Sequence, residues 1–169
     1  MTLKCREGVL RAMSPQRYEI RVADAGDLDA VSDLYRRSSL SNDGDRENLL
    51  ADPDLLVFDS TPIPERRTRV AVGDGQIVGF ATTRVVDDIL ELDDLFVDPD
   101  WMRRGVGSAL IVDVAAIARS RSIARIEVTA NGHALAFYEA AGFVRDGTAE
   151  TRFGTAPRMH LDAGPRFDA

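Results

Sequence analysis

The chain has 169 residues, about the length of one ordinary domain, so a second module of that size is not expected. Hydrophobic residues make up 44% of the sequence and charged residues 29%, a composition that excludes a disordered or fibrous chain and predicts one packed core. The net charge of -7, from 28 acidic and 21 basic residues, gives no overall attraction to polyanions, so we expect neither nucleic acid nor a membrane as a partner.

The sequence contains one cysteine, Cys5, and two histidines, His133 and His160. These residues cannot supply an internal disulfide or a Cys/His zinc site, so we expect packing alone to stabilise the fold and no bound metal. Apolar residues nowhere run together for the length of a membrane span, and charges interrupt the first residues where a secretory peptide needs an apolar core. We therefore expect a cytoplasmic protein.

The first half of the chain predicts a strand, helices and a hairpin. Side chains alternate in residues 18–22, and apolar residues recur at helical spacing from Leu28 onward. Residues 41–67 are broken by Asp, Gly and Pro into short pieces with one expected helix around residues 46–50, and a long irregular segment of this kind often faces substrate. An Asp-Gly pair at residues 74–75 lies between two apolar runs and predicts the tight turn of a hairpin.

The second half predicts further strands and helices. They are a strand over residues 89–97, a long helix over 106–118, a strand over 125–129, a short helix over 135–141 and a C-terminal hairpin. In chain order the elements are β-α-(α)-β-β-β-α-β-α-β(-β), an α/β (α+β) pattern. We expect the domain to span residues 18–162, between an N-terminal extension at residues 1–17 and a tail at residues 163–169.

A loop with the sequence Arg-Arg-Gly-Val-Gly-Ser, residues 103–108, lies just before the long helix. The first turn of a helix leaves backbone N–H groups without partners, and the helix dipole favours an anion there. The two glycines let phosphate oxygens approach these amides, and the two arginines can add charged hydrogen bonds. The loop therefore predicts a phosphate or pyrophosphate site; the alternative is a glycine-softened loop with solvated arginines.

Two common phosphate-binding motifs do not fit this loop. A dinucleotide-binding loop needs a third small residue where Leu110 stands, and a nucleotide P-loop needs a Gly-Lys-Ser/Thr sequence that is absent here. What remains resembles the GNAT superfamily of acyl-CoA-dependent N-acyltransferases, in which a strand leads through Pro and an Arg/Gln-x-x-Gly-x-Gly/Ala loop into a helix. Residues 95–110 follow this pattern, with Met102 at the position where the family has Arg or Gln.

A second segment is similar to another GNAT signature, Asn-x-x-Ala-x-x-Phe-Tyr-x-x-x-Gly-Phe. It is Asn-Gly-His-Ala-Leu-Ala-Phe-Tyr-Glu-Ala-Ala-Gly-Phe at residues 131–143, and the resemblance as a whole covers residues 18–161. It implies the GNAT fold: a central mixed, mostly antiparallel sheet of six to seven strands with a splayed fourth strand, flanked by about four helices. It also implies acetyl-CoA as the co-substrate, and it allows a homodimer, which is common in the superfamily.

The strand before the loop carries a signal that does not depend on the family. Its apolar side chains first occupy even positions, Leu90 and Leu92, and then odd positions, Leu95 and Val97. A β-bulge at residues 93–94 would restore the alternation, splay the strand from its neighbour and free backbone groups for a ligand. In the alternative without a bulge, Phe96 simply packs on a second buried face.

The resemblance implies which residues hold the cofactor. The backbone of residues 95–97 would bind the acyl-pantetheine and its thioester oxygen, and Asn131 would hydrogen-bond the pantetheine or the turn that starts the next helix. The complete set is Leu95, Phe96, Val97, Arg103, Arg104, Gly105, Val106, Gly107, Ser108 and Asn131.

Acyl transfer to nitrogen requires a neutral amine and a proton for the departing thiolate. An alkyl amine with a pKa near ~10.4 is protonated at neutral pH, so a carboxylate should help to remove its proton. By resemblance Glu91 is the first candidate base; Asp93, on the same face of a regular strand, is the second, and each could instead be a solvated carboxylate. Tyr138 is by resemblance the candidate acid for the CoA thiolate, with core packing as the alternative.

These expectations describe an N-acetyltransferase that moves an acetyl group from acetyl-CoA directly to a primary amine of a small molecule. Residues 87–100 contain seven acids and no base, which predicts a cationic acceptor. A protein or peptide N-acetyltransferase and a non-catalytic acyl-CoA-binding module remain as alternatives.

Overall fold

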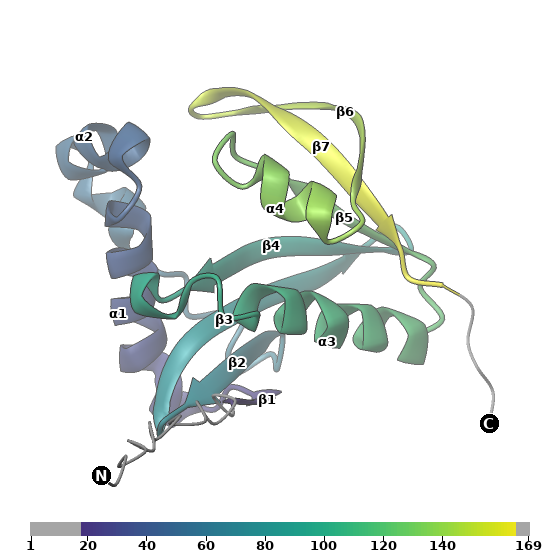
Figure 1. Cartoon of the computed structure of the whole chain (residues 1–169), viewed down its shortest axis with the longest axis horizontal. Helices are drawn as coiled ribbons and strands as arrows, with labels where there is room; N and C mark the ends of the chain where they lie inside the picture. Colours follow the sequence, from purple (N-terminus) through teal and green to yellow (C-terminus); the bar gives the residue numbers. More distant parts are fainter. Residues whose placement is uncertain (1–17, 165–169) are drawn as a thin grey trace, which may run out of the picture.

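The computed structural model describes residues 18–164, which form seven strands and four α-helices (Figure 1). The strands are β1 (Tyr18–Val22), β2 (Thr68–Gly73), β3 (Gln76–Val86), β4 (Ile89–Val97), β5 (Arg125–Thr129), β6 (Val144–Thr151) and β7 (Gly154–Asp162). The helices are α1 (Leu28–Leu40), α2 (Asp43–Ala51), α3 (Val106–Ser120) and α4 (Leu135–Ala140). The predicted order of elements is confirmed, and the helix expected around residues 46–50 is α2.

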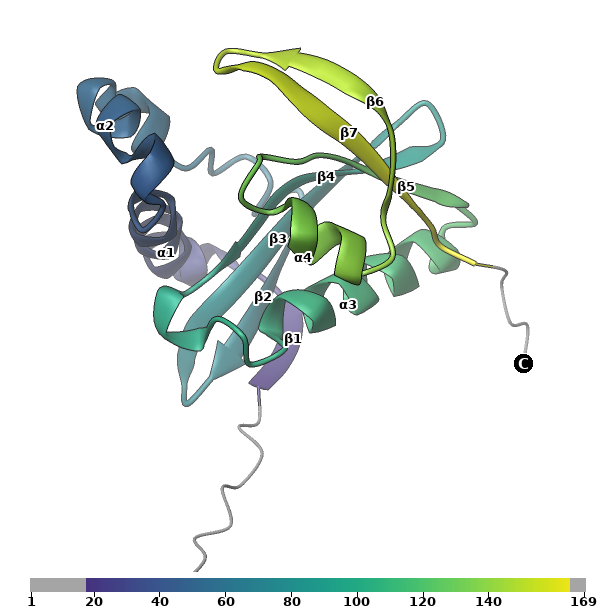
Figure 2. The ribbon, with the colours of Figure 1, turned by 45° about the horizontal axis from the view of Figure 1, so that its top comes forward.

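All strands belong to one sheet, in the order β1-β2-β3-β4-β5-β7-β6. Every neighbouring pair is antiparallel except β4 and β5, which are parallel. The predicted mixed, mostly antiparallel GNAT sheet is therefore confirmed. Helices α3 and α4 pack on one face, while α1 packs on the opposite face and α2 packs against α1 (Figure 2).

Two hydrophobic cores hold these layers together. The larger core lies between the sheet and helices α3 and α4, and its fully buried members include Leu90, Leu110 and Ile126. The smaller core lies between α1 and the middle of the sheet, around Leu34 and Phe80. Because the central strands are covered on both faces, β3 is buried continuously over residues 78–83 rather than at alternate positions.

Both hairpins at the centre of the sheet close with left-handed turn residues. Asp74 (φ 52°) and Gly75 (φ 75°) join β2 to β3, as the Asp-Gly pair predicted, and Asp87 (φ 47°) and Asp88 (φ 65°) join β3 to β4. Positive φ at both central positions gives a two-residue turn the twist of the flanking strands. These turns set the register that places β4 beside β3.

Ala163, which follows β7, packs against the end of α3 and the start of β5. Ala163 is buried, its N–H donates to the Ala124 carbonyl (2.8 Å), and its own carbonyl accepts a hydrogen bond from Arg119 (2.8 Å). The expected extension at residues 1–17, and residues 165–169 of the expected tail, lie outside the described residues. Within residues 18–164, no helix has the length and apolar character needed to cross a membrane.

Candidate functional site

Strand β4 changes partners half-way along its length. Its proximal half, residues 89–92, pairs in parallel with residues 125–128 of β5, whereas its distal half, residues 93–97, pairs with β3 alone. Thr82 lies opposite Asp94 and Thr83 opposite Leu92, so Asp93 is the extra residue of a bulge. The predicted bulge and the splayed fourth strand are therefore confirmed, and the edge of the distal half that β5 leaves free is called here the open edge of β4.

The backbone of the distal half is divided between β3 and the open edge. The Asp98 N–H donates to the Val78 carbonyl of β3 (2.8 Å). Because hydrogen bonds alternate along an antiparallel ladder, Phe96 also bonds to β3, while the backbone groups of Leu95 and Val97 point to the open edge. The backbone of Leu95 and Val97 therefore faces the open edge, and that of Phe96 faces β3; the assignment of Leu95, Phe96 and Val97 to the acyl-pantetheine stays a prediction.

Helix α1 holds the end of β4 in position. The Ser38 hydroxyl donates to the Val97 carbonyl (2.9 Å), and Arg37 forms an ion pair with Asp98 (2.7 Å). The Asp98 carboxylate also accepts the Asp100 N–H (2.9 Å) and so caps the turn that follows. The carbonyl of Val97 is therefore occupied by the Ser38 hydroxyl. The N–H of Val97 is the group that remains for a ligand at the open edge.

The predicted phosphate loop leads directly into α3. Gly105 is the N-cap with φ 81° and offers no side-chain cap, and no acid lies in the first turn, which runs through Ser108. The first N–H groups of α3 therefore point out of the helix, and no side chain of residues 18–164 is bound to them. Arg103 and Arg104 are exposed beside them, and the Arg104 guanidinium lies over the Trp101 ring at 5.2 Å. This arrangement suits an anion.

Two contacts from other elements position this loop. The Tyr18 hydroxyl of β1 donates to the Gly105 carbonyl (3.1 Å). A methyl group added at Gly107 would lie 3.0 Å from two ring carbons of Phe137 in α4. Gly107 therefore allows α3 and α4 to pack closely, in addition to its predicted role of letting a phosphate approach.

Asn131 caps the turn that leads into α4. Its side-chain oxygen accepts the Ala134 N–H at 2.9 Å, which is the turn-capping alternative of the prediction. This hydrogen bond orders the backbone between β5 and α4. The start of α4 is thereby held in place, on the side of the sheet that carries α3.

Tyr138 of α4 is buried in the larger core. Its ring meets Phe137 and Phe143 edge-on, with centroids 5.2 Å away in each case. In the part of the chain that is described, its hydroxyl forms no hydrogen bond. Burial, with a contribution from the charge of Asp94, raises the pKa of Tyr138. The phenol therefore keeps its proton at neutral pH and has it available to donate.

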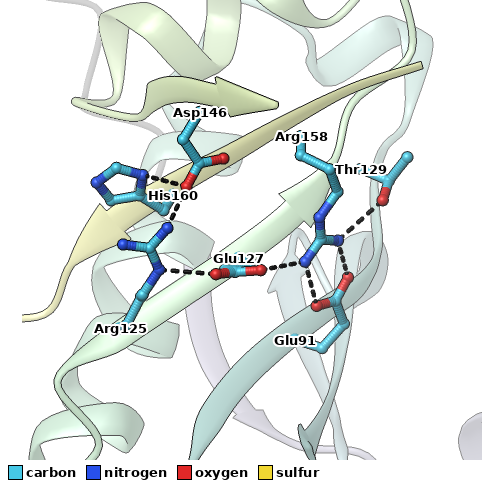
Figure 3. A network of polar contacts seen from close by, with 7 residues as sticks. All are labelled: Glu91, Arg125, Glu127, Thr129, Asp146, Arg158 and His160. Atoms are coloured by element: carbon cyan, nitrogen blue, oxygen red, sulfur yellow. Dashed lines mark hydrogen bonds and ion pairs between the residues drawn. The ribbon is translucent and has the colours of Figure 1, made fainter. Parts of the chain in front are cut away.

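Glu91, the first candidate base, belongs to a network of charges that crosses four strands, β4, β5, β6 and β7 (Figure 3). Arg158 of β7 donates to both carboxylate oxygens of Glu91 (2.5 and 3.0 Å), to the Thr129 hydroxyl (2.9 Å) and to Glu127. Glu127 lies opposite Glu91 and also accepts a hydrogen bond from Arg125 (2.7 Å). The bond to Glu91 raises the pKa of Arg158, and the bonds from Arg125 and Arg158 lower the pKa of Glu127. Both oxygens of Glu91 are thus bound to a cation.

Arginines also pair with other acids of the segment that predicted a cationic acceptor. Asp93, the second candidate base, forms an ion pair with Arg84 (2.8 Å), and Asp98 forms one with Arg37. Counting acids along the sequence could not detect these pairs, because the arginines come from β3, α1 and β7. Asp94 is the acid of β4 that has no cation partner within residues 18–164.

Sequence analysis did not single out Ser38, Arg158 or Asp94 as individual functional residues. Ser38 and Arg158 lie 59 and 67 positions from the residues they bind, so no local pattern could reveal them. The sequence did contain a pattern that indicates the position of Asp94. Asp94 lies beyond the bulge and two residues before Phe96, so both side chains must point to the same face of the sheet.

The sequence model of the acetyltransferase (GNAT) family matches residues 28–143 of this chain. The chain belongs to the GNAT acetyltransferase family. This GNAT chain is 40% identical over 72 residues to the ribosomal protein bS18 alanine N-acetyltransferase of Escherichia coli (strain K12). The aligned segment covers 41% of this chain and 49% of that protein. The chain is 34% identical over 76 residues to the glucosamine 6-phosphate N-acetyltransferase of Trypanosoma brucei brucei, covering 41% and 52%. The chain thus spans about half the length of the curated relatives it matches.

Solved GNAT structures show the same fold over nearly the whole domain. The PaiA N-acetyltransferase from Thermoplasma acidophilum, crystallised in complex with coenzyme A, matches with a TM-score of 0.68 and 18% identity over 86% of this chain and 99% of that one. The ribosomal-protein-S18-alanine N-acetyltransferase from Escherichia coli matches with a TM-score of 0.64 and 23% identity over 90% and 97%. At these identities the likeness establishes the fold.

Proposed function

We propose that this GNAT protein is an N-acetyltransferase that moves an acetyl group from acetyl-CoA directly to a primary amine. The observation that carries the proposal is the open edge of β4, which lies next to the uncapped N-terminus of α3: a methyl group added at Gly107 would lie 3.6 Å from the Val97 side chain. One end of this region offers free strand N–H groups, and the other offers helix N–H groups beside two arginines. A thioester arm joined to a pyrophosphate has matching groups at its two ends.

The roles of the residues follow from their positions. The N–H groups of α3 residues 106–108, with Arg103 and Arg104, bind the pyrophosphate. The N–H groups of Leu95 and Val97 bind the pantetheine and the thioester oxygen, which carries more negative charge when the amine adds to the carbonyl carbon. Tyr138 then donates its proton to the thiolate that leaves. Glu91 and Asp93 stay predictions for the base, each paired with an arginine.

The identity of the amine is the open part of the proposal. The sequence predicted a small-molecule acceptor. The named relatives include one enzyme for an amino sugar phosphate and one for the alanine of a ribosomal protein, so a protein N-terminal amine is the second candidate. A homodimer and a cytoplasmic location also stay predictions.

Binding of acetyl-CoA is tested by thermal unfolding. Millimolar acetyl-CoA should raise the Tm of the wild-type protein, because a ligand that binds the folded state stabilises it. Ser108→Glu should abolish this shift: residue 108 is exposed in the first turn of α3, where a carboxylate is compatible with the helix but competes with the pyrophosphate. Val112→Glu adds the same charge to an exposed position further along α3 and should leave the shift intact. A wild-type protein without a shift would contradict the proposal.

Turnover separates an enzyme from a non-catalytic acyl-CoA-binding module. Release of CoA thiol from acetyl-CoA is measured with a panel that contains spermidine, glucosamine 6-phosphate and a peptide with an N-terminal alanine. An enzyme releases thiol with at least one amine and yields an N-acetylated product by mass spectrometry. A module that binds acetyl-CoA and releases no thiol with any of these amines contradicts the catalytic part of the proposal.

A further inference from the structure

Asp94 differs from the other acids of β4 because nothing neutralises it. Glu91 is bound by Arg158 and Asp93 by Arg84, whereas no Arg, Lys or His of residues 18–164 lies within ion-pair distance of Asp94. One carboxylate oxygen, Oδ2, accepts a hydrogen bond from the Thr82 hydroxyl, and Oδ1 has no hydrogen bond within the described chain.

The surroundings of Asp94 are poor in water. Its partner Thr82 is completely buried, and Asp94 itself is partly buried. Asp94 shares a sheet face with Phe96, whose ring lies 5.0 Å from that of Tyr35 in α1. Burial raises the pKa of Asp94, and the charges of Asp93 and Asp59 raise it further. A carboxylate in such a place is costly unless a cation or a set of hydrogen bonds compensates for its lost hydration.

Asp94 lies in the distal half of β4, and its side chain is on the face of the sheet that α1 covers. It follows the bulged residue and precedes Leu95, whose backbone faces the open edge. Its charge contributes to raising the pKa of Tyr35 on the α1 side and of Tyr138 on the α4 side.

We infer that Asp94 binds the ammonium group of the acceptor and takes up its proton, so that the substrate is a primary amine that arrives as a cation. The inference rests on the proposed function. The ammonium supplies the missing positive charge, the half-buried rings of Tyr35 and Phe96 lie on the same side, and aromatic faces favour a cation. The backbone that would hold the thioester belongs to the next residue, so the amine bound at Asp94 is next to the carbon that it attacks.

The proton and electron changes balance without a further reactant. The ammonium gives one proton to Asp94, and the lone pair of the neutral nitrogen forms the bond to the thioester carbon. When the C–S bond breaks, its electron pair goes to sulfur, which receives the proton of Tyr138. The nitrogen loses its second proton, which restores the Tyr138 hydroxyl, and Asp94 releases its own proton to water. The products are the amide, CoA thiol and one proton.

The test compares Asp94→Asn with Glu91→Gln and Asp93→Asn, the isosteric variants of the two acids predicted as bases, and with the control Asp33→Asn at an exposed position of α1. Each is assayed for CoA release with the best amine of the panel. Asp94→Asn should lower kcat/KM for the amine by about 100-fold while the KM for acetyl-CoA changes little, because the base and the charge partner are both lost. Asp33→Asn should change kcat/KM by less than about threefold, since an exposed surface acid away from β4 contributes little. Loss of activity in Glu91→Gln with an active Asp94→Asn would overturn the inference.

A binding measurement keeps the inference separate from the proposed function. With CoA bound, so that no transfer can occur, spermidine or the alanine peptide should raise the Tm of the wild-type protein and leave that of Asp94→Asn unchanged. An amine that stabilises both proteins equally overturns the assignment. So does a large fall in Tm of Asp94→Asn without ligands, because it would make Asp94 a structural residue. If the amine shift depends on Asp94 but no thiol is released from acetyl-CoA, the proposed transfer fails and the binding role of Asp94 stands.

Discussion

The two halves of β4 are adjacent in sequence and opposite in character. The proximal half is hydrogen-bonded to strands on both sides, and its acid, Glu91, is held by Arg158 in a network that joins β4, β5 and β7. The distal half has a strand on one side only, and its acid Asp94 has a hydroxyl as its partner in place of a cation. A single bulged residue, Asp93, separates the two.

One strand can thus serve stability in one half and, under the proposed function, ligand binding in the other. Charges in the proximal half are neutralised, so this part holds the sheet together. Backbone and charge in the distal half are left unsatisfied, which costs stability and creates a place for a ligand that supplies the missing partners. The predictions below test whether substitutions in the two halves separate stability from activity in this way.

The largest effect is expected beside the distal half, at Tyr138. Tyr138→Phe should lower kcat about 100-fold or more, because the thiolate then leaves without a proton donor. The ring contacts with Phe137 and Phe143 are retained, so the Tm should be unchanged. Thiol release and thermal unfolding are measured on the same samples. An unchanged kcat would show that Tyr138 only packs.

The next effect is on stability and belongs to the proximal half. Arg158→Met should lower the free energy of unfolding by about 2–3 kcal/mol, because it leaves Glu91 and Glu127 opposite each other on neighbouring strands. Urea unfolding measures the change. The double variant Arg158→Met/Glu91→Gln should recover most of it, since one of the two like charges is gone. A single variant as stable as the wild type would show that the network does not stabilise the sheet.

The pH dependence of stability should have one sign for Glu127, in the charge network beside the proximal half of β4, and the opposite sign for Asp94 in the distal half. The pKa of Glu127 is lowered by Arg125 and Arg158, so its stabilisation is present above its unfolded pKa of about 4.3 and is lost as the pH falls through the lower folded value. The pKa of Asp94 is raised by burial, so stability is lost as the pH rises from about 3.9 through the higher folded value.

Variants of Glu127 and Asp94 measure how each carboxylate changes the stability of the protein with pH. At neutral pH, Glu127→Gln should be about 1 kcal/mol less stable than the wild type, and Asp94→Asn should be at least as stable as the wild type. Both differences should shrink as the pH is lowered toward 3, because the wild-type acids become protonated. Urea unfolding at several pH values measures them. Two variants that change with pH in the same direction would contradict the comparison.

The smallest effect is expected at the junction of α1 with the distal half. Ser38→Ala removes the hydrogen bond to the Val97 carbonyl and should cost about 1 kcal/mol of stability. It should also raise the KM for acetyl-CoA by about two- to threefold, since the end of β4 is held less firmly. Ser39→Ala, a change of the same size at the next position of α1, is the control and should leave both quantities unaltered.

Local patterns in the sequence predicted much of the fold. The bounds of β1, β4 and β5 agree with the alternation of side chains, and the change of phase between Leu92 and Leu95 located the bulge. The loop at residues 103–108 lies at the N-terminus of α3 as its glycines predicted. These features depend on residues within a few positions of one another. The spacing of apolar residues along the sequence there matches the period of the strand or helix that forms.

The pairing of charges could not be predicted in the same way. The acids of residues 87–100 looked like one patch for a cationic acceptor, but arginines from α1, β3 and β7 neutralise several of them. Each of these arginines meets its acid because the sheet brings distant strands together. Which carboxylate stays unpaired therefore depends on the whole topology, and no count of charges along the chain reveals it.

The sequence by itself determined the elements, the bulge, the anion-binding loop and the resemblance to GNAT proteins, because each is a short-range pattern. Only the tertiary structure decided that Glu91 is held in a network and that Asp94 is the acid of β4 without a cation partner among residues 18–164. The physical reason is that the free energy of a carboxylate depends on its hydration and on its nearest charges, and folding sets both through contacts between residues far apart in the chain.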